Sequence, residues 1–517
     1  MIRKISQYPF LPLVFFLFSL LLYASNIGGP SIYILDEAKN AECAREMFVK
    51  GDPVIPTFNE VLRTDKPPLH YFFMMGAYTL FGVNPFAARF FSALFGALTI
   101  LLSYLFVRRY AGKEQALLTA LVLLASVHLS IQFHLAVPDP YLIFFLSAAL
   151  MSFYAAVQEK KRIFIWGIYL AVGLGTLTKG PVAIGLPGLA FLLFLLFSRR
   201  FHWQEIRMLH PFSGALLVLL IVLPWYILVH LKTAGAWTEG FFLEHNLERF
   251  ARGKEGHGGT FLITFVYVMT GMFPFSAFLP QALNRASCKR KDELVLFCLV
   301  SALTIILFFA LSHTRLPNYT VPAYPFLAIL LAGYLQNNNG RMKLKASMIL
   351  LLLFGLILVP VVTAGLYLDP ALRKISYAGL YFLPLPLLLF LAFLQWQKGK
   401  TETALLWIAG SGTATALIFF LLAFPTVDQQ NPVVKSTPLV RNREVRYYGK
   451  FNPAYSFLLQ KEIFPVKREE LESFFRRHPE GIIISTRKYT DQLQLPDELE
   501  ISFSARDILE RPTTVLI

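Results

Sequence analysis

Apolar runs of about 20 residues recur along most of the chain, and each is long enough to cross a lipid bilayer as a helix. Lipid cannot hydrogen-bond backbone N–H and C=O groups, so a single spanning segment must be helical. Charged residues form only 15% of the chain, against roughly 25% in typical soluble proteins, and 56% of the residues are apolar. These features exclude a water-soluble globular fold and predict an all-α polytopic membrane protein.

Thirteen segments are candidates for spanning helices. Another apolar run, 69–81, is too short to span comfortably, and its length favours an interfacial or re-entrant helix. The thirteen predicted spans are 10–27, 86–107, 116–137, 141–157, 163–178, 181–197, 212–231, 261–283, 294–311, 319–335, 346–368, 377–396 and 405–424.

Lys and Arg residues cluster in every second connection between these spans, as at Arg108, Arg109, Lys160 and Lys161. Such clusters stay in the cytosol, which places the N-terminus there as well. Orientation in the membrane therefore explains the net charge of +16 better than nucleic-acid binding does. The long segments 28–85, 232–260 and 425–517 then all lie outside, and the chemistry is expected on that face.

The chain after residue 424 has a different, mixed composition. We expect a transmembrane domain over 1–424 and a small extracytoplasmic α/β domain over 425–517. Its expected elements are a helix at 466–477 and strands at 482–485, 499–503 and 513–517.

The first outer segment carries two groups of chemically useful residues. Asp36 and Glu37 begin a predicted helix over 35–50 that Gly51 ends. A carboxylate there serves either as an N-cap or as a general base that positions an acceptor. Lys66, which closes the segment, pairs either with lipid head groups in general or with the phosphate of one specific lipid.

The later outer connections add further candidates. Asp139, between two prolines, either makes a turn or meets Asp36 over one pocket. Lys179 and its neighbours are predicted to form a simple turn. The other polar candidates of these connections are His245, Asn246, Arg249, Arg252, His257 and Arg315. The arginines suit phosphate binding or head-group anchoring, and the two histidines alone are a weak metal signal.

Several motifs in order resemble those of the bacterial 4-amino-4-deoxy-L-arabinose transferases and their relatives. These enzymes belong to the GT-C class, together with protein O-mannosyltransferases. The similar stretches include Gly-Asp-Pro-Val, Asp-Lys-Pro-Pro-Leu-His-Tyr, Phe-Gly-Val-Asn-Pro-Phe-Ala-Ala-Arg, Leu-Thr-Lys-Gly-Pro and Arg-Leu-Pro-Asn-Tyr. They cover residues 34–335, and the combination is more specific than any single motif.

The resemblance implies a polyprenyl-phosphate sugar donor and transfer on the outer leaflet. Asp36 would be the chief catalytic carboxylate and Asp139 its partner. Lys66 would hold the donor phosphate, with the following residues nearby: Arg249, Arg252 and His257. The expected acceptor-positioning residues are Glu37, His245, Asn246 and Arg315. Some relatives bind a metal between a carboxylate and histidines, for which Asp65 and His257 are the candidates here, although transfer itself requires no cofactor.

The function that we predict is an inverting membrane glycosyltransferase of the bacterial inner membrane. It would move a sugar from undecaprenyl phosphate to an acceptor such as lipid A. Transfer to protein Ser or Thr is one alternative, and a lipid flippase or transporter is another. Transporters place ionisable groups near the bilayer midplane, whereas the carboxylates here cluster at the outer surface.

Overall fold

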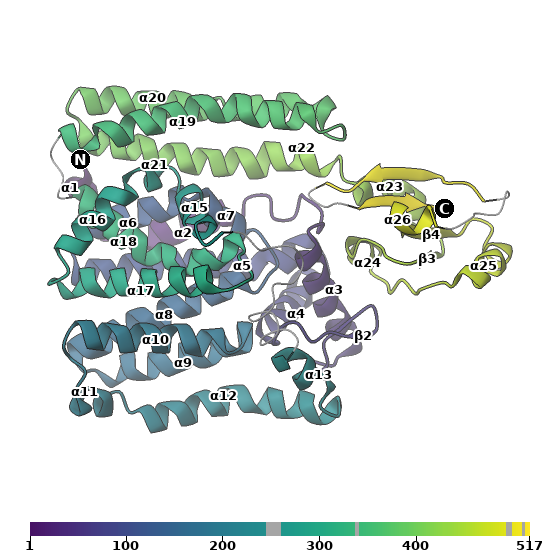
Figure 1. The fold of residues 1–517 in the computed structure, drawn as a ribbon, viewed down its shortest axis with the longest axis horizontal. Helices are drawn as coiled ribbons and strands as arrows, with labels where there is room; N and C mark the ends of the chain where they lie inside the picture. Colours follow the sequence, from purple (N-terminus) through teal and green to yellow (C-terminus); the bar gives the residue numbers. More distant parts are fainter. Residues whose placement is uncertain (244–259, 337–340, 493–498, 509–511) are drawn as a thin grey trace.

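The computed structural model describes residues 1–243, 260–336, 341–492, 499–508 and 512–517. Figure 1 shows long helices lying side by side, with a smaller mixed region at the end opposite the N-terminus. Seven of the described helices are long and apolar enough to span a membrane, or up to nine if two bent pairs each form one span. A multi-span, mostly helical membrane protein is therefore confirmed, while the count of thirteen spans stays a prediction.

The helices of the bundle follow the predicted segments closely. Their bounds are α2 (Leu11–Tyr23), α5 (Pro85–Tyr110), α6 (Lys113–Ala125), α7 (Val127–Phe133), α8 (Asp139–Glu159), α9 (Arg162–Lys179), α10 (Val182–Phe197), α12 (Pro211–Lys232), α15 (Ile263–Gly271), α16 (Leu279–Cys288), α17 (Glu293–Leu311), α18 (Tyr324–Gln336), α19 (Arg341–Leu368), α20 (Pro384–Gln397) and α21 (Thr401–Ile418). Shorter helical pieces join them: α1 (Ile2–Ile5), α11 (Trp203–Met208), α13 (Ala236–Glu239), η2 (Phe275–Phe278), η3 (Pro317–Ala323), η4 (Arg373–Phe382), η5 (Phe419–Ala423) and α22 (Phe424–Asp428).

Two of the predicted spans, 116–137 and 261–283, contain a pair of helices with a bend between them. The chain turns by 69° between α6 and α7, where the Ser126 hydroxyl caps α7 and also donates to the Gly271 carbonyl at 2.8 Å. It turns by 116° between α15 and the helical run that begins at Phe275. Pro274 lies in that break, and proline cannot continue the hydrogen-bond ladder of a helix.

The first outer segment folds as the sequence predicts. Helix α3 (Leu35–Lys50) ends at Gly51, whose φ of +65° suits glycine at a helix end. A short hairpin of β1 (Thr57–Phe58) and β2 (Val61–Leu62) follows, and then α4 (Leu69–Phe81). These elements lie at the end of the bundle that faces the C-terminal region (Figure 1).

The C-terminal region contains a four-stranded sheet of order β3-β4-β6-β5. Its strands are β3 (Val445–Tyr447), β4 (Ile482–Thr486), β5 (Phe503–Arg506) and β6 (Thr513–Leu516), and its helical pieces are α23 (Pro432–Val440), α24 (Ala454–Leu459), η6 (Arg468–Glu470), α25 (Leu471–Arg477) and α26 (Arg487–Thr490). Strand β3, which pairs in parallel with β4, was not predicted from the sequence. The strand expected at 499–503 begins only at Phe503, and the last apolar helical run continues past residue 424 to Asp428.

The C-terminal region shares a hydrophobic core with the first outer segment. Met47 of α3 and Tyr78 of α4 belong to the same buried cluster as Tyr455, Phe457 and Ile463 of the C-terminal region. The burial of apolar area from both parts is the main force that holds such layers together. The C-terminal region thus packs directly on α3 and α4.

Candidate functional site

Asp36 lies in the first turn of α3 with its side chain exposed. Ile34 is the N-cap residue of this helix, so the alternative in which Asp36 caps it is wrong. The Asp36 carboxylate has no hydrogen-bond partner in the described part of the chain, and the buried guanidinium of Arg63 acts on it electrostatically. An exposed carboxylate at the positive end of a helix is available to interact with a substrate.

Glu37, the next residue, is buried and ion-paired with Arg89 of α5 at 2.7 Å. Its Oε1 atom also accepts from the backbone N–H of Ala136 at 2.9 Å. Both carboxylate oxygens are therefore occupied. These contacts orient the start of α3, and an acceptor-positioning role for Glu37 stays a prediction.

The loop before Asp139 is tied to α3. Besides its bond to Glu37, Ala136 accepts from the Asn40 amide at 3.4 Å. Asp139 follows three residues later as the first residue of α8. The structure thus brings the two predicted catalytic carboxylates onto neighbouring elements that hydrogen bonds hold together.

Asp139 is almost fully buried, and its charge is compensated. Lys179, the last residue of α9, donates to its Oδ1 atom at 2.7 Å, and the Asn318 amide donates to the same oxygen at 2.9 Å. The Lys179 ammonium also lies 5.0 Å from the ring centroid of Tyr319. No basic residue lies near Asp139 in the sequence, and Lys179 was predicted to form part of a turn. The ion pair between Asp139 and Lys179 was therefore not predicted.

Lys66 lies between β2 and α4, in a segment rich in buried polar groups. Arg63 donates to Asn40 at 2.9 Å and ion-pairs with Asp65 at 3.3 Å, while the Trp237 indole of α13 donates to the Arg63 carbonyl. Burial, with the charges of Arg63 and Lys66, lowers the pKa of His70 and keeps its ring neutral. Arg63 was not predicted as a site residue from the sequence, although its position three residues before Lys66 could have indicated that it lies near the site.

The remaining predicted residues have different outcomes. Arg315 is described, and its Nε atom donates to the Ala310 carbonyl at 3.0 Å. Five others lie at 244–259, outside the described residues: His245, Asn246, Arg249, Arg252 and His257.

The proposed metal site gains no support from Asp65, its one described member. The Asp65 carboxylate faces the positive charge of Arg63. Among the described residues, one other group has metal-ligand spacing, Glu42, Glu46 and Glu462. Arg45 and Lys50 ion-pair with these three carboxylates and compensate their charge. This group therefore fits a structural network better than a metal centre.

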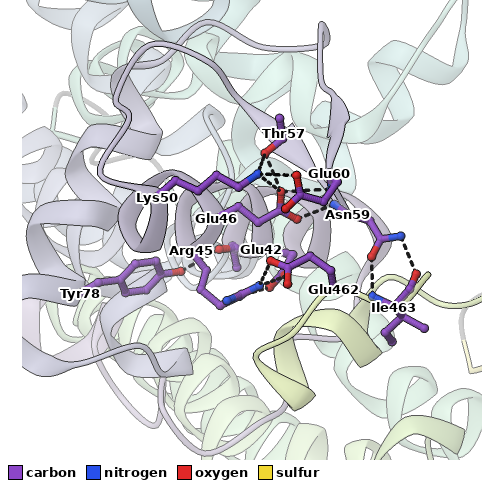
Figure 2. A network of polar contacts seen from close by, with 11 residues as sticks. Glu42, Arg45, Glu46, Lys50, Thr57, Asn59, Glu60, Tyr78, Glu462 and Ile463 are labelled. Carbon is purple, nitrogen blue, oxygen red and sulfur yellow. Dashed lines mark hydrogen bonds and ion pairs between the residues drawn. The ribbon is translucent and has the colours of Figure 1, made fainter. Parts of the chain in front are cut away.

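That network joins α3 to the C-terminal region (Figure 2). Arg45 makes a bidentate contact with Glu42 and reaches Glu462 at 3.0 Å. The Asn59 amide donates to the Ile463 carbonyl at 2.6 Å and accepts from the Ile463 N–H at 2.7 Å. This pair of bonds between the Asn59 side chain and the Ile463 backbone fixes the C-terminal region over the hairpin.

Replacing Asn59 with Asp is expected to loosen the C-terminal region. The carboxylate cannot donate to the Ile463 carbonyl, and a buried unsatisfied partner costs about 1–3 kcal/mol, with more for a charge. Limited proteolysis of the purified protein should release C-terminal fragments faster. Asn442→Asp, at an exposed site, is the matched control, and equal cleavage of both variants would contradict the anchoring role.

The chain is similar to several known proteins. A family model described as dolichyl-phosphate-mannose-protein mannosyltransferase matches residues 65–228. An uncharacterised protein of Aquifex aeolicus is 30% identical over 417 residues, which cover 80% of this chain and 78% of that protein. The undecaprenyl phosphate-alpha-4-amino-4-deoxy-L-arabinose arabinosyl transferase of Erwinia tasmaniensis is 33% identical over 359 residues, which cover 68% of this chain and 64% of that enzyme. The match thus spans slightly less than two thirds of the named enzyme.

The fold also resembles a solved structure over nearly its full length. The crystal structure of ArnT from Cupriavidus metallidurans bound to undecaprenyl phosphate has a TM-score of 0.82 and 23% sequence identity. The alignment covers 98% of this chain and 97% of that one, so the C-terminal region is included.

Proposed function

We propose that the chain belongs to the family of GT-C membrane glycosyltransferases that includes the aminoarabinose transferases, and that it transfers a sugar from undecaprenyl phosphate to lipid A. The reaction takes place on the outer side of the bacterial inner membrane, with the N-terminus in the cytosol. Residues 1–424 form the membrane part, and residues 425–517 form a domain on the outer face. The bonds from Glu37 and Asn40 to Ala136, which tie the Asp36 helix to the Asp139 loop, support this proposal most directly.

In the proposed mechanism the donor enters from the membrane and is already activated, so no nucleotide is needed. An acceptor oxygen bonds to C1 of the sugar as the bond between C1 and the donor phosphate oxygen breaks. Asp36 orients the acceptor and takes its proton. The leaving polyprenyl phosphate carries the electron pair, and Lys66 neutralises its charge. Attack from the face opposite the leaving group inverts the configuration at C1.

Further residues are proposed to assist on the acceptor side and on the donor side of the site. Arg315 is proposed to help position the acceptor, and so are His245 and Asn246. Arg249, Arg252 and His257 are proposed to assist Lys66 with the donor phosphate. Asp139 is proposed as the catalytic partner of Asp36, and its buried contact with Lys179 fixes the ends of α8 and α9 relative to each other.

A transfer assay with purified protein in proteoliposomes tests the function. Undecaprenyl phosphate carrying radiolabelled aminoarabinose, or another sugar, is supplied together with either lipid A or a Ser/Thr peptide. We expect label to move to lipid A, and we expect no movement to the peptide. Label appearing on the peptide would reassign the acceptor to protein. Labelled donor that crosses the bilayer unchanged, without a transfer product, would favour a flippase and overturn the proposal.

A further inference from the structure

A cleft of about 700 Å³ lies between the start of α3 and the C-terminal region. Leu35 and Lys39 of α3 line one side, and residues of the C-terminal sheet and its loops line the other. Ligand pockets commonly have volumes of about 300–1,000 Å³. Leu35 directly precedes Asp36 in α3, but neither Asp36 nor Lys66 is among the residues that line the cleft.

The lining of the cleft carries more positive than negative charge. Lys39, Lys450 and Lys488 contribute three ammonium groups, and Lys450 and Lys488 are exposed. Asp507 contributes the one carboxylate among the described lining residues, and it is buried, where it accepts from the Thr514 hydroxyl at 2.9 Å. Ammonium groups in this excess favour an anionic ligand, and phosphate is the anion that lysine commonly binds in proteins.

Asn452 adds a buried donor without a partner. Its side chain is only 5% exposed, and its Oδ1 atom accepts from the Ala454 N–H at 3.0 Å. Its Nδ2 atom is buried and has no hydrogen-bond partner in the described part of the chain. An unsatisfied buried donor costs free energy, and an acceptor atom of a ligand in this cleft would remove that cost.

Aromatic rings complete the lining. The rings of Tyr447 and Phe451 lie 4.6 Å apart, and Tyr489 packs closely against the backbone at Gly449. A Cβ atom at Gly449 would lie 2.4 Å from the Tyr489 ring, and its φ of +71° also favours glycine. Flat apolar rings beside donors suit a ligand with both a sugar ring and a charged group, more than they suit free phosphate.

We propose that this cleft binds the phosphorylated sugar head group of the acceptor glycolipid. Lys39, Lys450 and Lys488 contact its phosphate, Asn452 donates to a sugar or phosphate oxygen, and Tyr489 packs against the sugar. The inference rests on the proposed transferase function, because it assigns to the acceptor a cleft lined in part by α3, the helix that carries Asp36. It gives the C-terminal region a direct role in acceptor recognition.

A binding measurement tests this inference without any turnover. The probe is fluorescent lipid A in detergent micelles, compared with the same lipid after removal of its phosphates. Lys450→Gln combined with Lys488→Gln should weaken the binding of phosphorylated lipid A by about ten-fold or more. Binding of the phosphate-free lipid should be weaker from the start and unchanged by these substitutions.

The matched control is Lys435→Gln combined with Lys467→Gln, which removes two exposed lysines of the C-terminal region that do not line the cleft. Equal affinities of the two double variants for phosphorylated lipid A would overturn the inference. Competition by phosphatidylglycerol micelles as strong as that by lipid A would also overturn it, because the site would then bind any anionic lipid.

Kinetics separate this inference from the transferase proposal. In the transfer assay, the cleft variant should raise the KM for lipid A by about ten-fold, with the KM for the donor unchanged. If the wild-type protein transferred no sugar but still bound phosphorylated lipid A through these lysines, only the transferase proposal would fail. If transfer occurred and the KM for lipid A did not respond, only the assignment of the cleft would fail.

Discussion

Replacing Asp36 with Asn is expected to lower kcat for sugar transfer by about 10²–10⁴-fold, the range that a positioned general base contributes. Asn keeps the shape of the side chain but cannot take a proton. The fold should survive, because the side chain is exposed and has no hydrogen-bond partner in the described part of the chain. The loss of a negative charge in the first turn of α3 costs about 0.3–1 kcal/mol at most.

The measurement pairs initial transfer rates with the thermal unfolding midpoint of each purified variant. Asp491→Asn serves as the control, because it removes the same charge from an exposed site in the C-terminal region. The donor should bind to Asp36→Asn as tightly as to the wild type, because the phosphate contact is proposed for Lys66 and not for Asp36. If the variant transferred sugar at the rate of the control, Asp36 would not be the base.

Local patterns in the sequence predicted the elements that carry the site. Helix α3 was predicted with its bounds because small residues repeat along one face and Gly51 stops the helix. The bounds of α4 were likewise clear, since its apolar run lies between prolines and Gly82. Such signals depend on residues within one or two turns of each other, and no tertiary information is needed to recognise them.

Contacts between distant segments could not be predicted in the same way. Lys179 meets Asp139 across 40 positions, and Asn318 reaches Asp139 across 179. Neither separation in sequence corresponds to a repeat or a motif, so both contacts of Asp139 depend on how α8, α9 and η3 pack. The two bends were missed for a similar reason, because hydropathy alone does not distinguish a straight span from a broken one.

The C-terminal region illustrates the same difference. The fully buried strand β4 was predicted from its continuous run of apolar residues. Strand β3 is short and of mixed composition, and only its pairing with β4 reveals it. The contacts of this region with α3, such as those of Arg45 and Asn59 (Figure 2), join residues about 400 positions apart and have no local signature.

Replacing Lys179 with Met is expected to destabilise the protein strongly. The substitution keeps much of the side-chain volume but leaves Asp139 buried with only the Asn318 amide as a described partner. Removing one member of a buried ion pair costs about 3–5 kcal/mol, because the remaining charge is uncompensated. The thermal unfolding midpoint in detergent should fall clearly, and transfer should be lost at temperatures where the variant unfolds.

The double variant, Lys179→Met with Asp139→Asn, separates structure from catalysis. It removes both charges, so we expect most of the lost stability to return, since a neutral pair of similar volume has no uncompensated charge. If Asp139 acts with Asp36 in catalysis, transfer should stay low although the midpoint recovers. Recovery of activity together with stability would show instead that the pair only holds α8 and α9 in place. Asp36 would then be left as the one catalytic carboxylate of the proposal.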